Sequence, residues 1–359
     1  MQEAAAVTER FSIKAPEGLS ERIRKLRDYY FMGAGRCWNN EYTAWTTGTP
    51  WDVQFNEITY YIVPETYLML QTLRSSYRQA ARPVTLPEGF WQWPQVRRRA
   101  WFVREVMVHY LPREILPGDL IAGGRFNIQT SLCLTEKEQK AFDRLVMGKK
   151  GVRAAVKWFH DHGYGNAGAT CGHLVPDYPR ALEMGWKGIH DGLKARYEKL
   201  SDAEKRGDKG AQLAAMMTSA AMPHDLAGKY ADLCQELAET ETDTSRQKEL
   251  LQMAENLRRV PWEPPKTFWE AVQALWLTHM LIMSDENYPG PGVSFGRIDQ
   301  YLYPYWQYSI ENGMDREFGK EILRCFWVHC NTVYDAMIRN GSDGITSGFG
   351  QLITLAGKG

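Results

Sequence analysis

Apolar side chains recur every three or four positions along most of the chain, which is the spacing of one face of an α-helix. The clearest helix follows Thr267, and its apolar face is formed by Val272, Leu275, Trp276 and His279. The same spacing predicts helices over residues 21–30, 65–81, 95–109, 246–259 and 316–337. The pattern therefore predicts a helix-rich fold.

Short motifs mark where several of these helices begin. Thr135 with Glu138, and Ser201 with Glu204, have the spacing of a capping box, in which a hydroxyl and a carboxylate satisfy the first helical amides. Ser20 stands where it can cap the helix over residues 21–30. We expect a helix to start at each of these residues.

Two short apolar runs, residues 115–123 and 351–355, predict buried strands. The first contains a Pro-Gly turn signal, and the second lies just before Gly359. A buried strand needs a neighbour on each side, because its backbone groups are otherwise left unpaired. We therefore expect the second run to find its missing partner outside residues 1–359.

Charge and composition narrow the class of protein. Lys and Arg together number 43 and so do Asp and Glu, so the chain lacks the basic excess of a nucleic-acid-binding protein. No apolar run approaches the ~18 residues of a membrane helix, and residues 1–10 do not resemble a signal peptide. The six cysteines form no CxxC pair, so we expect reduced thiols and a cytoplasmic protein. The 13 Trp, 18 Tyr and 13 Phe predict a large aromatic core or aromatic pocket walls.

A glycine-rich stretch over residues 163–178 is the first candidate for chemistry. His173 could present its imidazole to a substrate, or Asp177 could satisfy it locally. Cys171 is the one cysteine in a polar, glycine-rich setting, although no base is placed beside it by the sequence. Upstream, residues 160–162 read His-Asp-His and could form a metal site with His173, but a solvated helix end is the simpler interpretation.

The second candidate is the stretch over residues 289–306, in which two Pro-Gly turns redirect the chain. Ser294 stands where a strand end could point its hydroxyl into a cavity. Arg297 and Asp299 can pair, either as support for a pocket or as a buried ion pair beneath an aromatic core. Spacing alone leaves both interpretations open.

These stretches resemble a known family. Residues 264–276 read PPKTFWEAVQALW, residues 294–305 read SFGRIDQYLYPY and residues 172–178 read GHLVPDY. Residues 117–123, PGDLIAG, follow an arginine-rich helix. Together they resemble the glycyl radical enzymes of the pyruvate formate-lyase type. The resemblance implies an α/β, helix-rich fold, in which residues 1–359 form the N-terminal part of a ten-stranded barrel built from two five-stranded half-barrels.

The same resemblance implies radical chemistry. In that family a glycyl radical, installed by an S-adenosylmethionine iron-sulfur activating enzyme, oxidises a cysteine whose thiyl abstracts hydrogen from a small-molecule substrate. The family's Gly-Cys-x-Glu loop and its C-terminal radical loop do not occur in residues 1–359. We therefore expect these residues to be the incomplete N-terminal portion of a glycyl radical lyase of anaerobic metabolism. Alone it would be inactive and would bind no metal or cofactor, and the whole enzyme would form a homodimer.

Five residues carry over as site predictions. His173 and Ser294 match substrate-contacting positions of the family, and Asp177, Arg297 and Asp299 would support the pocket. The reaction implied is a decarboxylation or a dehydration. The alternative hypothesis is a non-catalytic helical binding protein that keeps the scaffold without the chemistry.

Overall fold

The computed structural model describes residues 18–31, 85–110, 113, 115–124, 133–164, 174–285, 293–331, 353 and 355. These residues are mostly helical, as the apolar spacing predicts. The predicted helix over residues 65–81 lies outside the described residues. Within the described part, no helix is long and apolar enough to cross a membrane.

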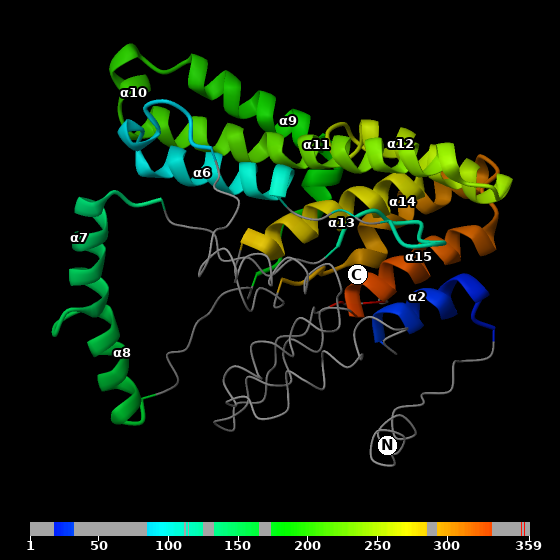
Figure 1. Cartoon of the computed structure of the whole chain (residues 1–359), viewed down its shortest axis with the longest axis horizontal. Helices are drawn as coiled ribbons and strands as arrows, with labels where there is room; N and C mark the ends of the chain where they lie inside the picture. Colours follow the sequence, from blue (N-terminus) through cyan, green and yellow to red (C-terminus); the bar gives the residue numbers. More distant parts are fainter. Residues whose placement is uncertain are drawn as a thin grey trace.

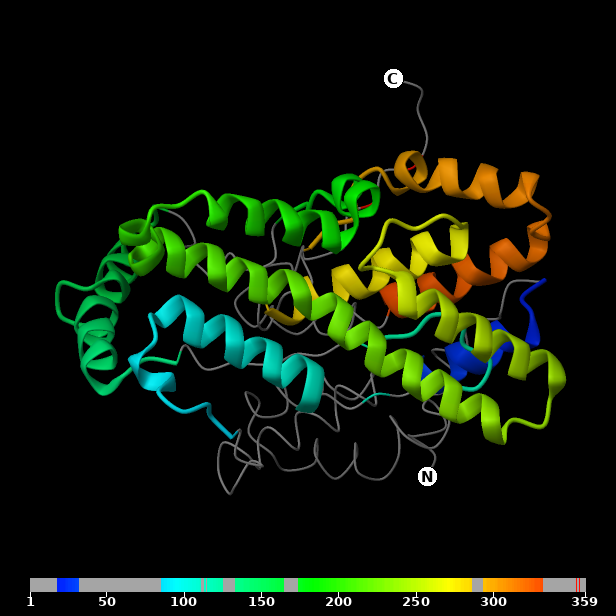
Figure 2. The same cartoon turned by 90° about the horizontal axis from the view of Figure 1, so that it is seen from above.

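The longest described helix is α11 (Asp208–Thr240), and several other helices pack against it. Seen from above, α6 (Gln95–Glu105) and α9 (Tyr178–Glu198) lie along its two sides (Figure 2). The last turns of α11 lead into α12 (Thr244–Arg259), which packs back against it. These close approaches are possible because many buried residues of α11 are alanines: Ala211, Ala215, Ala220, Ala227, Ala231 and Ala238.

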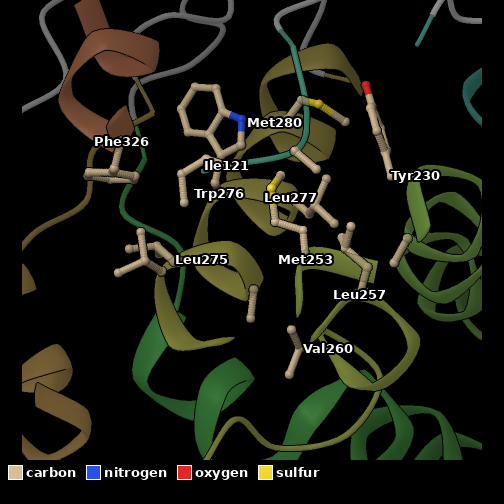
Figure 3. Close-up of a cluster of buried hydrophobic side chains, with 14 of the residues drawn as sticks. Ile121, Tyr230, Met253, Leu257, Val260, Leu275, Trp276, Leu277, Met280 and Phe326 are labelled. Carbon is tan, nitrogen blue, oxygen red and sulfur yellow. The ribbon is translucent and has the colours of Figure 1, made fainter. Parts of the chain in front are cut away.

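The core centres on α13 (Phe268–Asp285), which lies among α12, α14 (Ile298–Glu311) and α15 (Arg316–Asn331) (Figure 1). The sequence predicts one apolar face for this helix, but α13 is buried on nearly every side. Figure 3 shows Trp276, Leu277 and Met280 among side chains of α12, α15 and the segment around Ile121. Each fully buried side chain of this size contributes about 1.5–3 kcal/mol of transfer free energy.

Local signals place the helix starts correctly. Complete capping boxes at Thr135 and Ser201 begin α7 (Glu136–Met147) and α10 (Asp202–Arg206). At the start of α2 (Glu21–Phe31), the hydroxyl of Ser20 accepts from the amide of Ile23 at 3.3 Å. The same hydroxyl donates to the carboxylate of Glu321 on α15, so this cap also ties α2 to the core.

Three further features extend or flank these helices. The predicted helix over residues 95–109 continues past α6 as a π-helical turn, η2 (Val106–Tyr110). At one end of the molecule α7 is followed by α8 (Val152–Asp161), and the two helices contact each other (Figure 1). A short 3₁₀ turn, η1 (Phe90–Gln92), precedes α6.

The predicted strand over residues 115–123 is buried except at the Pro117-Gly118 turn, but it pairs with no strand among the described residues. Side chains of α13 satisfy its backbone instead. The side chain of Gln273 accepts from the Ala122 amide and donates to the Ala122 carbonyl, both at 2.8 Å, and the Trp269 indole donates to the Leu120 carbonyl at 2.7 Å. The prediction of a strand is therefore wrong here, because helix side chains supply the hydrogen bonds that a neighbouring strand would give.

Strand-like pairing is found at two places in the described chain. Leu174 and Val293 form an isolated parallel bridge, and Gly296 and Ile353 form another. The second bridge gives the predicted strand over residues 351–355 a neighbour on one side. The ten-stranded barrel stays a prediction.

Candidate functional site

The two stretches singled out in the sequence meet at the bridge between Leu174 and Val293. The amide of Ser294 donates to the carbonyl of Leu174 at 2.9 Å. Gly296, three residues after Val293, pairs with Ile353. The segment that carries Ser294 therefore lies between the segment that follows His173 and the segment near the end of the chain.

The segment around Ser294 is buried on both of its faces. Ser294 is 5% exposed, and its neighbours Val293 and Phe295 are 0% and 1% exposed. Burial on both faces is the environment of a central parallel strand. A hydroxyl held in such a place must be hydrogen-bonded, and it can both donate and accept.

Gly296 redirects the chain directly after this segment. Its φ of +67° lies in the left-handed region, and a Cβ at this position would stand 3.1 Å from Cγ1 of Val175. Both facts favour glycine, since a side chain would be strained and crowded. The turn lets α14 begin only four residues after Ser294.

Arg297 and Asp299 pair as the sequence predicts, with Nε of Arg297 3.3 Å from Oδ1 of Asp299. Their side chains are 42% and 24% exposed, so the interpretation as a buried ion pair is wrong. Asp299 lies in the first turn of α14, where a carboxylate is favoured by the helix dipole. Because the pair is partly exposed, it stabilises the protein by about 1 kcal/mol at most.

Asp177 has a local role in the structure. It is the N-cap residue of α9, and its carboxylate accepts from the amide of Arg180 at 3.2 Å. His173 and Cys171 lie outside the described residues, so the predicted contact of His173 with substrate or with Asp177 stays a prediction.

The His-Asp-His run at residues 160–162 lies at the exposed end of α8. Asp161 binds Lys157 at 2.5 Å, and this contact lowers the pKa of its carboxyl group. Nδ1 of His162 lies 2.8 Å from the Trp158 carbonyl. Among the described residues no three potential metal ligands come together. The structure thus agrees with a solvated helix end at these residues.

The described cysteines are not candidate nucleophiles. Cys133, Cys234, Cys325 and Cys330 are all buried. Burial raises the pKa of the Cys325 and Cys330 thiols well above the usual value, so both stay protonated. Cys325 and Cys330 are therefore core thiols.

Sequence reasoning missed a buried pair directly beneath the Ser294 segment. The phenol of Tyr178 and Nδ1 of His279 share a hydrogen bond of 2.5 Å, and the two residues are 1% and 0% exposed. The His279 ring stacks on Phe295, with 3.9 Å between ring centroids. Burial raises the pKa of Tyr178 well above its usual value, so the phenol stays neutral.

One signal could have revealed this pair. His279 occupies the apolar face of the most strongly predicted helix, and a buried imidazole requires a polar partner. Tyr178 of α9, His279 of α13 and Phe295, which follows Ser294, thus form one buried aromatic cluster. Among the described side chains it offers no reactive thiol for breaking a bond.

Comparison with known proteins points to one family. The family model described as pyruvate formate lyase-like matches residues 147–359, which is more than half of the chain. The (2S)-3-sulfopropanediol dehydratase of Klebsiella oxytoca is 33% identical over 235 residues, which cover 61% of this chain and 27% of the dehydratase. The indoleacetate decarboxylase of Tractidigestivibacter scatoligenes is 43% identical over 107 residues, which cover 30% of this chain and 12% of the decarboxylase.

A solved structure gives the same result. The crystal structure of a glycyl radical enzyme from Archaeoglobus fulgidus superposes with a TM-score of 0.54 and 26% sequence identity, covering 74% of this chain and 38% of that one. The chain thus spans well under half the length of each of these proteins.

Proposed function

Because the chain belongs to the pyruvate formate lyase-like family of glycyl radical enzymes, we propose that residues 1–359 are the N-terminal portion of a glycyl radical lyase. They would form part of one large domain whose second part lies outside this sequence. The observation that supports this proposal is the pairing of the Leu174 segment with the Ser294 segment, because His173 directly precedes Leu174 in the sequence.

The role of this chain would be to hold the substrate. The Ser294 hydroxyl would hydrogen-bond a polar group of the substrate at the end of a buried segment, and His173, one residue before Leu174, would contact it from the neighbouring segment. Asp177 would fix the start of α9 behind His173. Arg297 and Asp299 would fix the turn into α14 after Ser294.

Bond cleavage requires groups that residues 1–359 do not supply. In the whole enzyme a glycyl radical would supply the thiyl for hydrogen abstraction, and an S-adenosylmethionine iron-sulfur enzyme would install that radical. Both the Gly-Cys-x-Glu and the radical-loop motifs are absent from this sequence. A partner activating enzyme, a homodimer and a cytoplasmic location belong to the same proposal.

The reaction would be a dehydration or a decarboxylation of a small organic molecule. Relatives of both kinds support this choice, since one acts as a dehydratase and another as a decarboxylase. The enzymatic relatives favour a lyase over a non-catalytic binding protein. Within the described residues, the buried hydroxyl of Ser294 fits either substrate class because it can donate or accept.

The first experiment reads the DNA beyond codon 359. A continuing frame that encodes Gly-Cys-x-Glu and the radical glycine is the expected result, and its product should show a glycyl signal by electron paramagnetic resonance after anaerobic activation. A stop codon at this point would overturn the proposal in favour of the binding protein. So would a full-length product without that signal.

A second experiment tests Ser294 in the full-length enzyme. Ser294→Ala should raise KM about tenfold, which is the effect of losing one hydrogen bond to substrate. Ser309→Ala is a matched control. Ser309 lies in α14, is also buried, and its hydroxyl accepts from the amide of Phe268 at 2.8 Å. Both variants should lose stability, but only Ser294→Ala should change KM. An unchanged KM would remove Ser294 from the site.

A further inference from the structure

A cavity of about 480 Å³ lies between α6, α9, α11 and the C-terminal half of α13. This volume falls in the range of small-molecule pockets, ~300–1,000 Å³. The cavity is separate from the Ser294 segment, because the two contact opposite faces of α13. Thr278, Leu281, Ile282 and Asp285 line the cavity, and their spacing is that of one helix face. His279 and Trp276 project from the opposite face, where His279 stacks on Phe295.

The lining of the cavity is mostly apolar and leaves room for a ring. Small side chains stand on two of its walls, Ala100 on α6 and Ala215 and Ala220 on α11. Trp186 donates its indole N–H to Thr278 at 3.0 Å, so this residue adds mainly carbon to the wall. An apolar group of the size of an aromatic side chain would therefore be well accommodated.

One wall also presents a backbone acceptor. Pro223 lies inside α11 and has no N–H, so the carbonyl of Ser219 lacks its usual donor four residues later. Ser219 and Pro223 both line the cavity. An ammonium or another hydrogen-bond donor on a ligand would satisfy such a carbonyl.

The cavity contains one charge of each sign. Nη2 of Arg99 lies 3.0 Å from Oδ1 of Asp285, and these side chains are 23% and 52% exposed, so they stand nearer to solvent than the apolar walls. A ligand with a carboxylate and an ammonium can pair with both residues at once. Neither protein charge is then left without an opposite charge, which avoids the cost of an uncompensated charge.

We propose that this cavity is a binding site for an aromatic α-amino acid. Its carboxylate would pair with Arg99, and its ammonium would pair with Asp285 and the Ser219 carbonyl. Its ring would lie among Ala100, Ala215 and Trp186. The proposal does not depend on the radical chemistry, since every group that it uses belongs to residues 95–285.

Isothermal titration calorimetry of the chain with L-phenylalanine tests this proposal directly. Binding with a dissociation constant of about 1 mM or below is the expected result. 3-Phenylpropionate lacks the ammonium and phenethylamine lacks the carboxylate, so each should bind at least about tenfold more weakly. No heat of binding at millimolar L-phenylalanine would overturn the proposal, and so would equal affinity for the three compounds.

Matched variants on α6 locate the site. Arg99→Gln should weaken L-phenylalanine binding about tenfold or more, because it removes the partner of the carboxylate. Arg97→Gln is the control, since Arg97 is exposed, lies over the Trp93 ring at 5.3 Å and does not line the cavity. Ala215→Phe fills the space for the ring and should abolish binding, with circular dichroism checking its fold. Binding that survives Arg99→Gln unchanged would place the ligand elsewhere and refute the assignment.

Discussion

Nε2 of His329 lies 2.8 Å from Oδ2 of Asp119, although 210 residues separate them in the chain. Their side chains are 3% and 2% exposed. The other carboxylate oxygen of Asp119 accepts from the amide of Ile121 at 3.0 Å. One aspartate thus ties the buried segment 115–124 to α15.

Replacing Asp119 should therefore be costly. Asp119→Ala removes a hydrogen-bond partner of the His329 imidazole and of the Ile121 amide, and each buried hydrogen bond lost in this way costs about 1–3 kcal/mol. We expect a loss of about 2–4 kcal/mol in the free energy of unfolding, measured by urea denaturation. As a control, Asp232→Ala removes an ion pair with Arg258 that is half exposed on both sides, and should change stability by about 0.5 kcal/mol or less. Equal effects of the two variants would contradict this prediction.

Gln273 should be equally sensitive. Gln273→Leu keeps the volume but leaves the buried amide and carbonyl of Ala122 without their side-chain partner. The expected cost is about 2–4 kcal/mol, again by urea denaturation. Gln307→Leu is the exposed comparison, because Gln307 donates to Glu311 on the surface of α14. The prediction fails if the Gln273 variant unfolds at the same urea concentration as the native chain.

Gly185 marks a break inside α9 that only glycine fits. Its φ is +64°, and a Cβ there would lie 2.7 Å from the carbonyl carbon of Glu263. Gly185→Ala should destabilise the protein by at least about 2 kcal/mol. Gly192→Ala, on the same helix, meets no atom within 4 Å and should stabilise by about 0.5–1 kcal/mol. Thermal melting of the two variants should shift in opposite directions, and a shared shift would argue against the strain at Gly185.

Cys234 should resist alkylation in the folded chain. Burial raises the pKa of its thiol to about 12, so at pH 8 the reactive thiolate is only about one part in 10⁴. Iodoacetamide treatment followed by peptide mass spectrometry should find Cys234 unmodified in the native chain and modified in urea. Comparable alkylation in the two conditions would show that this thiol is accessible.

Glu204 should titrate well below an ordinary glutamate. Its contact with Lys209 at 2.8 Å and its capping bonds with Ser201 lower its pKa to about 2. Because the folded-state pKa is depressed, this stabilisation is fully present above pH ~4.5 and is lost as the pH falls towards 2.

Carbon NMR of labelled glutamate checks the value, with Glu204→Gln identifying the signal. Lys209→Met should move the midpoint upward, towards the usual value near 4.5. A midpoint near 4.5 in the native chain would contradict the capping geometry.

Part of the candidate site could be predicted from the sequence. Ser294 and the pairing of Arg297 with Asp299 lie within one short motif, so their proximity follows from chain connectivity. The side-by-side placement of Leu174 and Val293 could not be predicted, because no local signal sets the pairing of segments more than a hundred residues apart. The Tyr178–His279 bond was missed for the same reason.

The sequence by itself determined where helices start and which residues form their apolar faces. Capping boxes act within four residues and apolar spacing acts within a few turns, so both are local properties of the chain. Only the tertiary structure decided what happens to the apolar run at residues 115–123. Its hydrophobicity predicts burial, but burial requires only that every backbone group find a partner, and here Gln273 and Trp269 provide partners from a helix.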